Sequence, residues 1–287
     1  MTQNETGLPP APIKLIAVDL DGTVLGHDQV ATPRVLAALR AAVARGVRIT
    51  IATGRNVPTT RRFAEMLGVN APVVCGQGGE LYDFTTGQTL SVLRLDRALA
   101  CEIVQFAADY PHWHTILYHD NEIYIQRKIF SDQFYGKLLS SMEPHLVPDL
   151  CHVAGDTDPD KLIFAMNAEY TVEAVTLLRE FVGHRAIVVQ SHAMFAEVNP
   201  LGAHKGAGLT RLAESLGIQQ DEVMAIGDQE NDLTMLAWAG LGVAMGQASD
   251  MVKQSARWIA PSLDEDGAAV AIERFVLDGV GKVWSGG

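Results

Sequence analysis

The chain has 287 residues, of which 48% are hydrophobic and 20% charged, and 34 acidic against 22 basic residues give a formal net charge of −12. This much apolar material supports a packed core and excludes an intrinsically disordered chain. The excess of acid argues against binding to nucleic acids or to anionic membranes, because both require a basic surface.

The cysteines and the N-terminal segment predict a cytoplasmic protein. Cys75, Cys101 and Cys151 are odd in number and form no C-x-x-C pair, so we expect neither a disulfide framework nor a zinc ribbon. Residues 1–12 are polar and proline-rich and lack the apolar stretch of a signal peptide, so we expect a disordered tail. The sequence contains no apolar run that is long enough to predict a membrane span.

Residues 13–83 are expected to begin with three successive strand–helix units, a pattern typical of a parallel sheet. The apolar run 14–19 predicts a strand that is buried on both faces. A helix follows, with Thr32 as its N-cap and Gly46 just after its end. The next expected elements are a strand, a helix and the start of a third strand, at residues 47–52, 58–67 and 73–75.

Residues 84–190 have a different pattern and predict an α+β domain. Segments 85–88 and 120–121 each separate two strand-like runs, so each predicts the turn of a β-hairpin. Hairpins mixed with helices indicate an antiparallel sheet. Further helices are expected at about 96–110 and 171–182, and further strands at 162–166, 186–189 and 195–198.

The strand–helix alternation returns towards the C-terminus. Helices are expected at 205–216, 231–239 and 268–277, and strands at 223–226 and 241–244. The simplest architecture is a doubly wound, Rossmann-like α/β core built from residues 13–83 and 191–287. The α+β domain of residues 84–190 is then an insertion, which a surface loop tolerates because loop-closure entropy grows slowly with length.

Four polar clusters lie where a predicted strand ends or a predicted helix begins, which is where open α/β sheets bind ligands. They are Asp19-Leu20-Asp21-Gly22-Thr23, Thr53-Gly54-Arg55, Lys205, and Gly227-Asp228 with Asn231-Asp232. Asp19 and Asp228 offer the oxygen ligands that Mg²⁺ prefers, and a cation would relieve the repulsion between converging carboxylates. Lys205 and the Thr53 hydroxyl suit the oxygens of a phosphoryl group.

The same residue types predict a reaction. Asp19 is expected to act as a nucleophile that forms an aspartyl-phosphate. Asp21 follows in a turn that Gly22 relaxes, where it can protonate the leaving oxygen and then deprotonate the attacking water.

Taken in order, the four clusters resemble the motifs of the haloacid dehalogenase (HAD) superfamily of phosphatases. The position of the insertion, together with segments 242–246 and 264–269, is similar to the type IIB (Cof-like) branch. The resemblance implies a HAD core with an α+β cap at residues 84–190 that sets substrate specificity. It also implies that Asp19 is the nucleophile and Asp21 the acid and base.

The resemblance further implies the ligands of the metal and of the phosphoryl group. Mg²⁺ would be held by Asp19, the backbone carbonyl of Asp21, and Asp228, and Asp232 would support the metal or Lys205. The groups implied for the phosphoryl group are the Leu20 amide, Thr53, Gly54, Lys205 and Asn231.

Two positions depart from the family pattern. The family often has Asn-Gly after the third strand, where this chain has Gly76-Gln77-Gly78-Gly79, and it commonly has Ser at the position of His204. Both departures affect local loop contacts and leave the carboxylates and Lys205 in place.

Three histidines of the inserted domain, His112, His114 and His119, offer zinc binding or substrate contact as alternatives to an ordinary surface role. A structural zinc site takes four ligands, and no cysteine lies near them in sequence, so the surface role is favoured.

We therefore predict a Mg²⁺-dependent phosphatase that hydrolyses small phosphomonoesters, either sugar phosphates or phosphorylated cofactors. A phosphotransferase or phosphomutase with the same intermediate, and a non-catalytic protein that binds phosphorylated metabolites, stay open as alternatives. Asp21 favours hydrolysis, because the resemblance implies a non-acidic residue there in relatives whose intermediate must persist. The expected partner is a small phosphorylated metabolite, and the sequence does not predict an oligomeric state.

Overall fold

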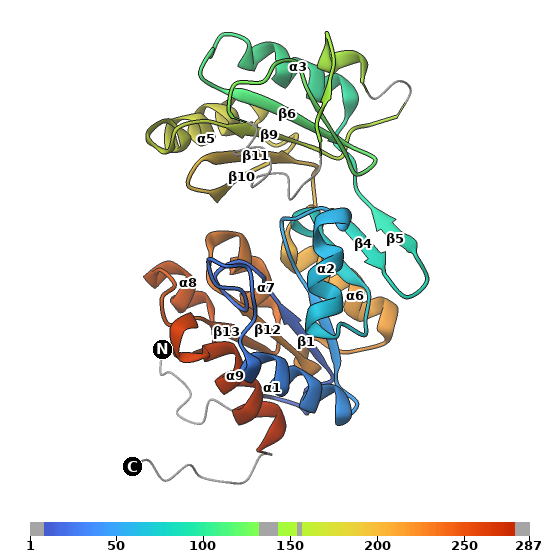
Figure 1. Ribbon diagram of the computed structural model, residues 1–287, viewed down its shortest axis with the longest axis vertical. Coiled ribbons are helices and arrows are strands. Elements are labelled where there is room, and N and C mark those ends of the chain that lie inside the picture. Colours follow the sequence, from blue (N-terminus) through green and yellow to red (C-terminus); the bar gives the residue numbers. More distant parts are fainter. Residues whose placement is uncertain (1–8, 132–142, 154–156, 279–287) are drawn as a thin grey trace. The chain divides into compact units, whose positions relative to one another are not determined.

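The computed structural model describes residues 9–131, 143–153 and 157–278. These residues fall into two compact units (Figure 1). The first, which we call the core unit, comprises Met1–Thr53, Thr60–Leu90 and His204–Gly287, and the second, the inserted unit, comprises Gly54–Thr59 and Ser91–Ala203. Of the tail expected at residues 1–12, residues 1–8 lie outside the described part.

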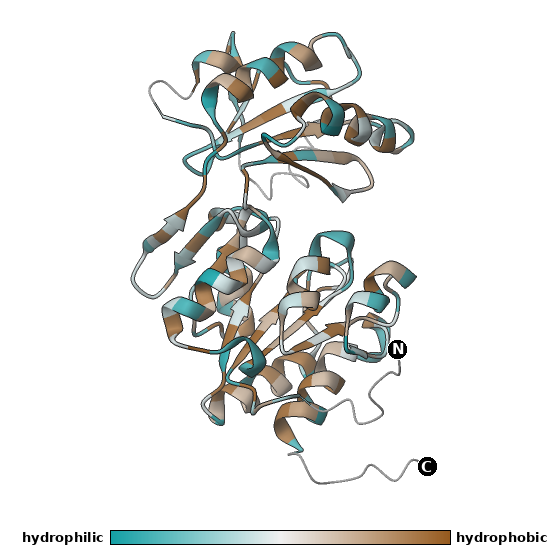
Figure 2. Ribbon diagram, turned by 180° about the vertical axis from the view of Figure 1, so that it is seen from behind, coloured by the Kyte–Doolittle hydropathy of each residue, from teal (hydrophilic) through white to brown (hydrophobic). Residues whose placement is uncertain are grey.

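The core unit is built around a five-stranded parallel sheet with the strand order β14-β13-β12-β1-β2. Its strands are β1 Leu15–Val18, β2 Arg48–Ile51, β12 Val223–Gly227, β13 Leu241–Ala244 and β14 Trp258–Ile259. β1 and β12 are buried along their whole length, which explains their continuous apolar sequence and their brown colour in Figure 2. The prediction of a doubly wound parallel sheet is confirmed.

Helices connect the parallel strands. α6 and α7 pack on one face of the sheet, where Leu209 and Met235 share a hydrophobic cluster with Leu15 of β1. α1 begins where the Thr32 hydroxyl accepts a hydrogen bond from the Val35 amide, as its sequence predicts. The helices of this part of the chain are α1 Pro33–Ala44, α2 Val57–Leu67, α6 Lys205–Leu216, α7 Leu233–Trp238, α8 Asp250–Ser255 and α9 Gly267–Ile272, which continues as a π-helical turn, Glu273–Leu277.

The prediction of a third strand–helix unit is wrong. β3 Val73–Cys75 meets the parallel sheet through one bridge, between Val74 and Ala52. A 3₁₀ turn and a strand pair then follow in place of a helix, so that β3, β4 Glu80–Asp83 and β5 Gln88–Val92 form a separate three-stranded sheet. The hairpin predicted around residues 85–88 is therefore present, and it takes the place at which a helix was expected.

The inserted unit has a six-stranded sheet in the order β10-β11-β9-β6-β7-β8 and two described helices, α3 Arg97–Ala107 and α5 Ala168–Val182. Its strands are β6 His114–His119, β7 Glu122–Ile125, β8 His145–Leu146, β9 Lys161–Ala165, β10 Ile187–His192 and β11 Phe195–Asn199. All strand pairs are antiparallel except β7 with β8. The predicted α+β pattern is confirmed.

The prediction that the cysteines form no disulfide is wrong. Cys101 of α3 and Cys151 are joined by a disulfide bond, with their Cα atoms 5.0 Å apart. They are 50 residues apart in sequence, and the short 3₁₀ helix Leu150–His152 brings them together by packing against α3. The bond removes the support that the cysteine count gave to a cytoplasmic location. Within the described ranges, no helix is long and apolar enough to cross a membrane.

Candidate functional site

Two carboxylates lie side by side at the carboxyl edge of the core sheet. β1 and β12 are parallel neighbours with Val18 opposite Ile226, so the residues that follow them come together. The Asp19 amide continues this pairing by donating to the Ile226 carbonyl at 3.0 Å. Asp19 and Asp228 are both buried, and this edge is where a doubly wound sheet binds ligands.

Lys205, the first residue of α6, supplies the positive charge of the cluster. Its Nζ donates to Asp19 Oδ1 and to Asp232 Oδ1, each at 2.6 Å, and its side chain is completely buried. Asp232 Oδ2 accepts hydrogen bonds from the amides of Asp228 and Gln229, both at 2.9 Å. Asp232 therefore fixes Lys205 and also shapes the loop that presents Asp228.

Asp228 is held by its neighbours in a fixed orientation. Its Oδ1 accepts from the Thr23 hydroxyl at 2.8 Å, and its Oδ2 accepts from Gln229 Nε2 at 2.9 Å. Gly22 makes this approach possible, because a Cβ on residue 22 would lie 2.5 Å from Asp228 Oδ2 and its φ of +89° disfavours other residues. Asp21, just before it, is exposed, unlike the buried Asp19.

The cluster has more negative than positive charge. Carboxylate oxygens of Asp19, Asp228 and Asp232 lie within 4.8 Å of one another, and Lys205 is the ammonium group among them. Burial raises the pKa of Asp19; Lys205 opposes this, and the two other carboxylates add to it. Burial also raises the pKa of Asp228. For Lys205, burial lowers the pKa, but Asp19 and Asp232 outweigh it and the pKa is raised. The proton therefore stays on Lys205, and the surplus of carboxylate suits a cation.

Thr53 and Asn231 are linked through a residue that the sequence did not single out as part of a site. The residue is Gln77. Its backbone N–H donates to the Thr53 carbonyl at 3.0 Å, and its side-chain Oε1 accepts from Asn231 Nδ2 at 3.1 Å. The sequence feature that could have pointed to Gln77 was the departure from the family's Asn-Gly at residues 76–79. Leu20, also in the core unit, is buried and accepts from the Leu25 amide.

Gly54 falls in the inserted unit and contacts a second buried lysine. Its carbonyl accepts from Lys161 Nζ at 3.0 Å, and the same Nζ donates to Glu197 Oε2 at 3.0 Å. Lys161 and Glu197 are about 95% buried, and Nζ lies 5.1 Å from the centre of the Tyr118 ring. The sequence feature that could have predicted this pair is a charged residue in each of two largely apolar strands, Lys161 in β9 and Glu197 in β11.

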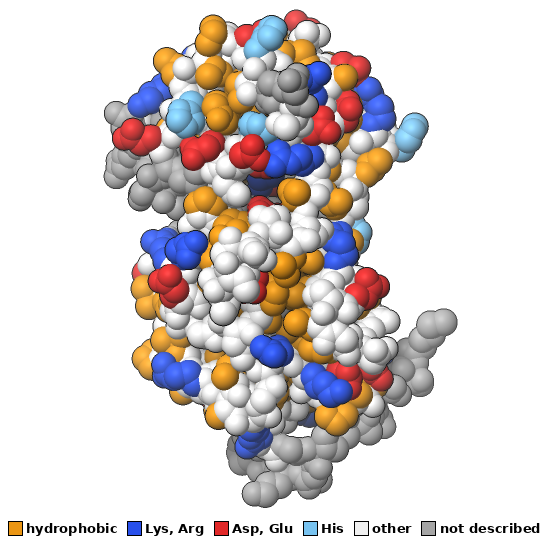
Figure 3. Space-filling model, turned by 90° about the vertical axis from the view of Figure 1, so that its right-hand side faces the viewer, with side chains coloured by type: hydrophobic (Ala, Val, Ile, Leu, Met, Phe, Trp, Pro, Cys, Tyr) orange, Lys and Arg blue, Asp and Glu red, His pale blue; other side chains and the backbone are white. Residues whose placement is uncertain are grey.

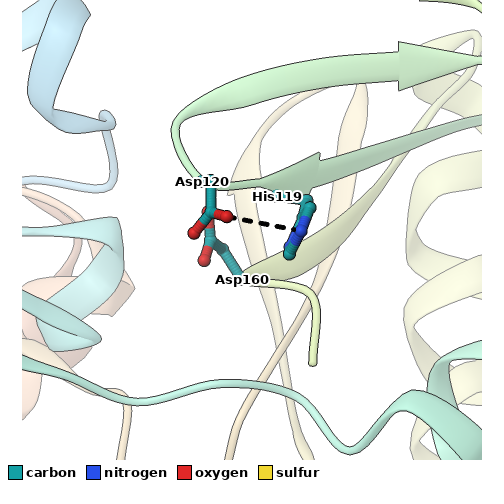
Figure 4. Close-up of side chains that lie close together, drawn as sticks. All are labelled: His119, Asp120 and Asp160. Carbon is teal, nitrogen blue, oxygen red and sulfur yellow. Dashed lines mark ion pairs between the residues drawn. The ribbon is translucent and has the colours of Figure 1, made fainter. Parts of the chain in front are cut away.

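His112, His114 and His119 do not converge on a metal site. His114 is buried, its pKa is lowered to about 4 by burial and by Arg127, and it packs edge-on against Phe130. His119 instead lies with Asp120 and Asp160 (Figure 4), where one oxygen or nitrogen of each is within 4.8 Å of the others.

A positively charged side chain that Figure 4 does not draw, Arg94, contacts all three of these residues. The Arg94 guanidinium donates to Asp120, lies 3.4 Å from Asp160 Oδ1 and contacts His119 Nδ1 at 3.3 Å. The arginine thus occupies the place that a cation would take between these carboxylates.

On the face seen in Figure 3, basic side chains are scattered among acidic and apolar ones.

Comparisons with known proteins agree with this architecture. The family of haloacid dehalogenase-like hydrolases matches residues 16–272. The 5-amino-6-(5-phospho-D-ribitylamino)uracil phosphatase YcsE of Bacillus subtilis is 32% identical over 92% of this chain and 96% of its own. The HMP-PP phosphatase of Serratia proteamaculans is 31% identical over 84% of this chain and 86% of its own.

Solved structures give the same result. A haloacid dehalogenase-like hydrolase from Bacteroides thetaiotaomicron superposes with a TM-score of 0.79 at 28% identity, over 91% of this chain and 99% of its own. A HAD subclass IIB sugar phosphatase has the same fold, with a TM-score of 0.77 at 22% identity over 91% and 98% of the two chains. The chain belongs to the haloacid dehalogenase-like hydrolases, in their Cof-like branch, and it is a phosphatase of that family. The resemblance seen in the sequence is confirmed.

Proposed function

We propose that this phosphatase is Mg²⁺-dependent and hydrolyses small phosphomonoesters through an aspartyl-phosphate on Asp19. The observation that supports this most strongly is the buried cluster of Asp19, Lys205, Asp228 and Asp232 at the ends of β1 and β12. It brings together a nucleophile, a fixed positive charge and further carboxylates, and these are functional groups that phosphoryl transfer requires.

Asp19 is the nucleophile in this proposal. The hydrogen bond from Lys205 to Oδ1 fixes the carboxylate, and the other oxygen, Oδ2, is the one that attacks phosphorus. Asp21 is the acid and base: it protonates the leaving oxygen and then takes a proton from the water that attacks the aspartyl-phosphate. Its exposed position suits both roles, because it can exchange protons with solvent between the two steps.

The donor set fits Mg²⁺. Asp19 and Asp228 supply carboxylate oxygens, and the surplus negative charge of the cluster favours a divalent cation over a further hydrogen-bond donor. The backbone carbonyl of Asp21 would complete the protein ligands. When bound there, the ion would neutralise charge on the phosphoryl oxygens.

The remaining site residues hold the phosphoryl group in this proposal. Lys205 provides the charge, and Thr53, Gly54, the Leu20 amide and Asn231 provide hydrogen-bond donors. Asp232 supports Lys205, since both of its oxygens are engaged by Lys205 and by the loop amides. Two hydrogen bonds fix Lys205 before substrate arrives, and such preorganisation is the main source of electrostatic stabilisation in these reactions.

The substrate class follows from the relatives. The names of two of them specify a phosphoribitylaminouracil and HMP-PP, both phosphorylated small molecules. For this chain we propose a sugar phosphate or a phosphorylated cofactor, with specificity set by the inserted residues 84–190.

A phosphate-release screen tests the proposal. The wild type is incubated with sugar phosphates, nucleotides, pyridoxal phosphate, flavin mononucleotide and 4-nitrophenyl phosphate, with Mg²⁺ or with EDTA. We expect release with Mg²⁺ only, and its loss in Asp19→Asn. Asp221→Asn, an exposed aspartate outside the cluster, is the matched control and should behave as wild type. Turnover by Asp19→Asn at the wild-type rate would contradict the proposal.

A further inference from the structure

The carboxamides of Gln77 and Asn231 form an incomplete pair. Asn231 Nδ2 donates to Gln77 Oε1 at 3.1 Å, which engages one polar atom of each side chain. The other two atoms, Gln77 Nε2 and Asn231 Oδ1, are buried and have no hydrogen-bond partner among the described residues. Gln77 is 2% exposed. A buried polar atom without a partner is costly, so this arrangement needs an explanation.

Gln77 is also held in an unusual backbone conformation. Its φ of 58° and ψ of 24° lie in the left-handed region, which few residues other than glycine adopt. Such a conformation persists where surrounding contacts impose it, and it is often found at functional sites. Here the Gln77 amide is tied to the Thr53 carbonyl at 3.0 Å.

The loop that contains Gln77 touches three of the proposed phosphoryl-binding elements. Gln77 bonds to Thr53 through its backbone and to Asn231 through its side chain. Its neighbour Gly78 lies directly against the backbone that leads into Lys205, because a Cβ on residue 78 would lie 2.3 Å from the His204 carbonyl oxygen. Gln77 is therefore at the point where these elements meet.

The direction of the hydrogen bond matters for binding an anion. With Nδ2 turned to Gln77, Asn231 has only Oδ1 left, and an acceptor cannot bond to a phosphoryl oxygen, which is also an acceptor. A half-turn of both carboxamides exchanges their nitrogen and oxygen positions and keeps the bond between them. Gln77 Nε2 then donates to Asn231 Oδ1, and Asn231 Nδ2 becomes an available donor.

We infer that Gln77 is a positioning residue for the phosphoryl group: through this paired rotation it holds Asn231 with Nδ2 available to the phosphoryl oxygens of the substrate and of the inorganic phosphate product. The inference rests on the proposed function, in which Asn231 binds the phosphoryl group. It explains why Asn231 keeps a buried polar atom without a partner, since after the rotation Oδ1 accepts from Gln77 and Nδ2 donates to the ligand.

The test is a double-mutant cycle on phosphate binding. Gln77→Met keeps the length of the side chain and removes its hydrogen bonds, and Asn231→Ala removes the group that it positions. Inorganic phosphate affinity is measured with Mg²⁺, as competitive inhibition of 4-nitrophenyl phosphate turnover and, independently of turnover, as a shift in unfolding temperature. We expect Gln77→Met to weaken phosphate binding about tenfold. In the Asn231→Ala background it should change affinity by less than about twofold, because its effect passes through Asn231.

Gln77→Glu gives a second signature. A carboxylate only accepts, so it locks Asn231 with Nδ2 turned inwards, and phosphate should bind more weakly than to Gln77→Met. The matched control is Gln29→Met, because Gln29 shares the φ of 58° and its side chain bonds to Arg62. This control should keep wild-type affinity. If Gln77→Met fails to fold, Gln77→Asn replaces it, since asparagine tolerates the left-handed region and is one methylene too short to reach Asn231.

The outcomes separate this inference from the proposed function. Independent, multiplicative effects of Gln77→Met and Asn231→Ala, or wild-type affinity in Gln77→Met, overturn the inference even when the wild type is an active phosphatase. A wild type that binds phosphate without hydrolysing any ester overturns the proposed function, while the binding cycle still decides the role of Gln77. A wild type that binds no phosphate overturns both.

Discussion

In the described part of the chain, each of the two units contains one lysine that is almost completely buried beside a carboxylate. The charges around these two lysines balance differently. In the core unit, Lys205 bonds to Asp19 and Asp232, and Asp228 lies in the same cluster. In the inserted unit, Lys161 bonds to the single carboxylate of Glu197 and to the Gly54 carbonyl.

The difference favours Lys205 over Lys161 for the proposed chemistry. The Lys161–Glu197 pair carries one charge of each sign, and Lys161 also donates to the Gly54 carbonyl, which suits a buried structural ion pair. The Lys205 cluster keeps a surplus of negative charge, and burial together with this surplus raises the pKa of Asp19 and of Asp228. A protein tolerates such a surplus where a bound cation or a reaction makes use of it.

Removal of the positive charge from the core cluster should have the largest effect. Lys205→Met leaves Asp19 and Asp232 uncompensated and removes the cation that faces the phosphoryl group. We expect kcat/KM for phosphate release to fall by at least ~10³-fold, a magnitude typical of a cation that stabilises phosphoryl transfer. Steady-state kinetics measure it, and a fall of less than tenfold would show that Lys205 acts only structurally.

The same change in the inserted unit should act on stability. Lys161→Met leaves Glu197 buried without its partner, which typically costs about 3–5 kcal/mol in the free energy of unfolding. Urea unfolding measures the loss. The double variant Lys161→Met, Glu197→Met should recover most of it, because it leaves no uncompensated charge. Equal stability of the single and double variants would contradict a balanced pair.

A third prediction concerns the pH dependence of stability, to which the buried His114 contributes. Because burial lowers the pKa of His114 to about 4, below its unfolded value of 6.5, the folded state resists protonation while the unfolded state accepts it. Stability should therefore be fully present above pH 6.5 and fall as the pH drops from 6.5 towards 4, by up to about 3 kcal/mol. Urea unfolding across this range should show a weaker pH dependence in His114→Phe, whereas His112→Gln, at an exposed histidine, should match the wild type.

The smallest effect concerns the start of α6. His204 Nδ1 accepts from the Ala207 amide at 3.1 Å, so the histidine performs the N-cap role for which serine is common. We expect His204→Ser to keep wild-type stability and His204→Ala to lose about 1 kcal/mol. Thermal unfolding measures both, and an equal loss in the two variants would show that the ring acts by packing instead.

Local signals were sufficient to predict that Asp19, Asp228 and Lys205 lie close together. Asp19, Asp228 and Lys205 each follow a strand or begin a helix whose pattern is clear in the sequence, and parallel strands bring their carboxyl ends together. Asp232 lies four residues after Asp228, so its contact with the same loop is local too.

What the sequence could not predict depends on contacts between distant segments. The Lys161–Glu197 pair requires the register of β9 with β11, and the Cys101–Cys151 bond requires a short turn to pack on α3. The antiparallel pairing of β3 with β4 was not predicted either, because a three-residue strand does not reveal its partner. Gln77 was visible only as a departure from a family pattern, since its function depends on Asn231, 154 residues away.

The covalent intermediate is the most direct test of the central claim, that Asp19 is phosphorylated during turnover. In Asp21→Asn the water that attacks the aspartyl-phosphate loses its base, while 4-nitrophenyl phosphate, with its good leaving group, still phosphorylates the enzyme. Acid-quenched protein is digested and the peptide that contains Asp19 is analysed by mass spectrometry. We expect a gain of one phosphoryl group on that peptide in Asp21→Asn with Mg²⁺, and none in Asp19→Asn, Asp21→Asn. A phosphoryl group on another residue, or phosphate release that persists after Asp19→Asn, would contradict the account.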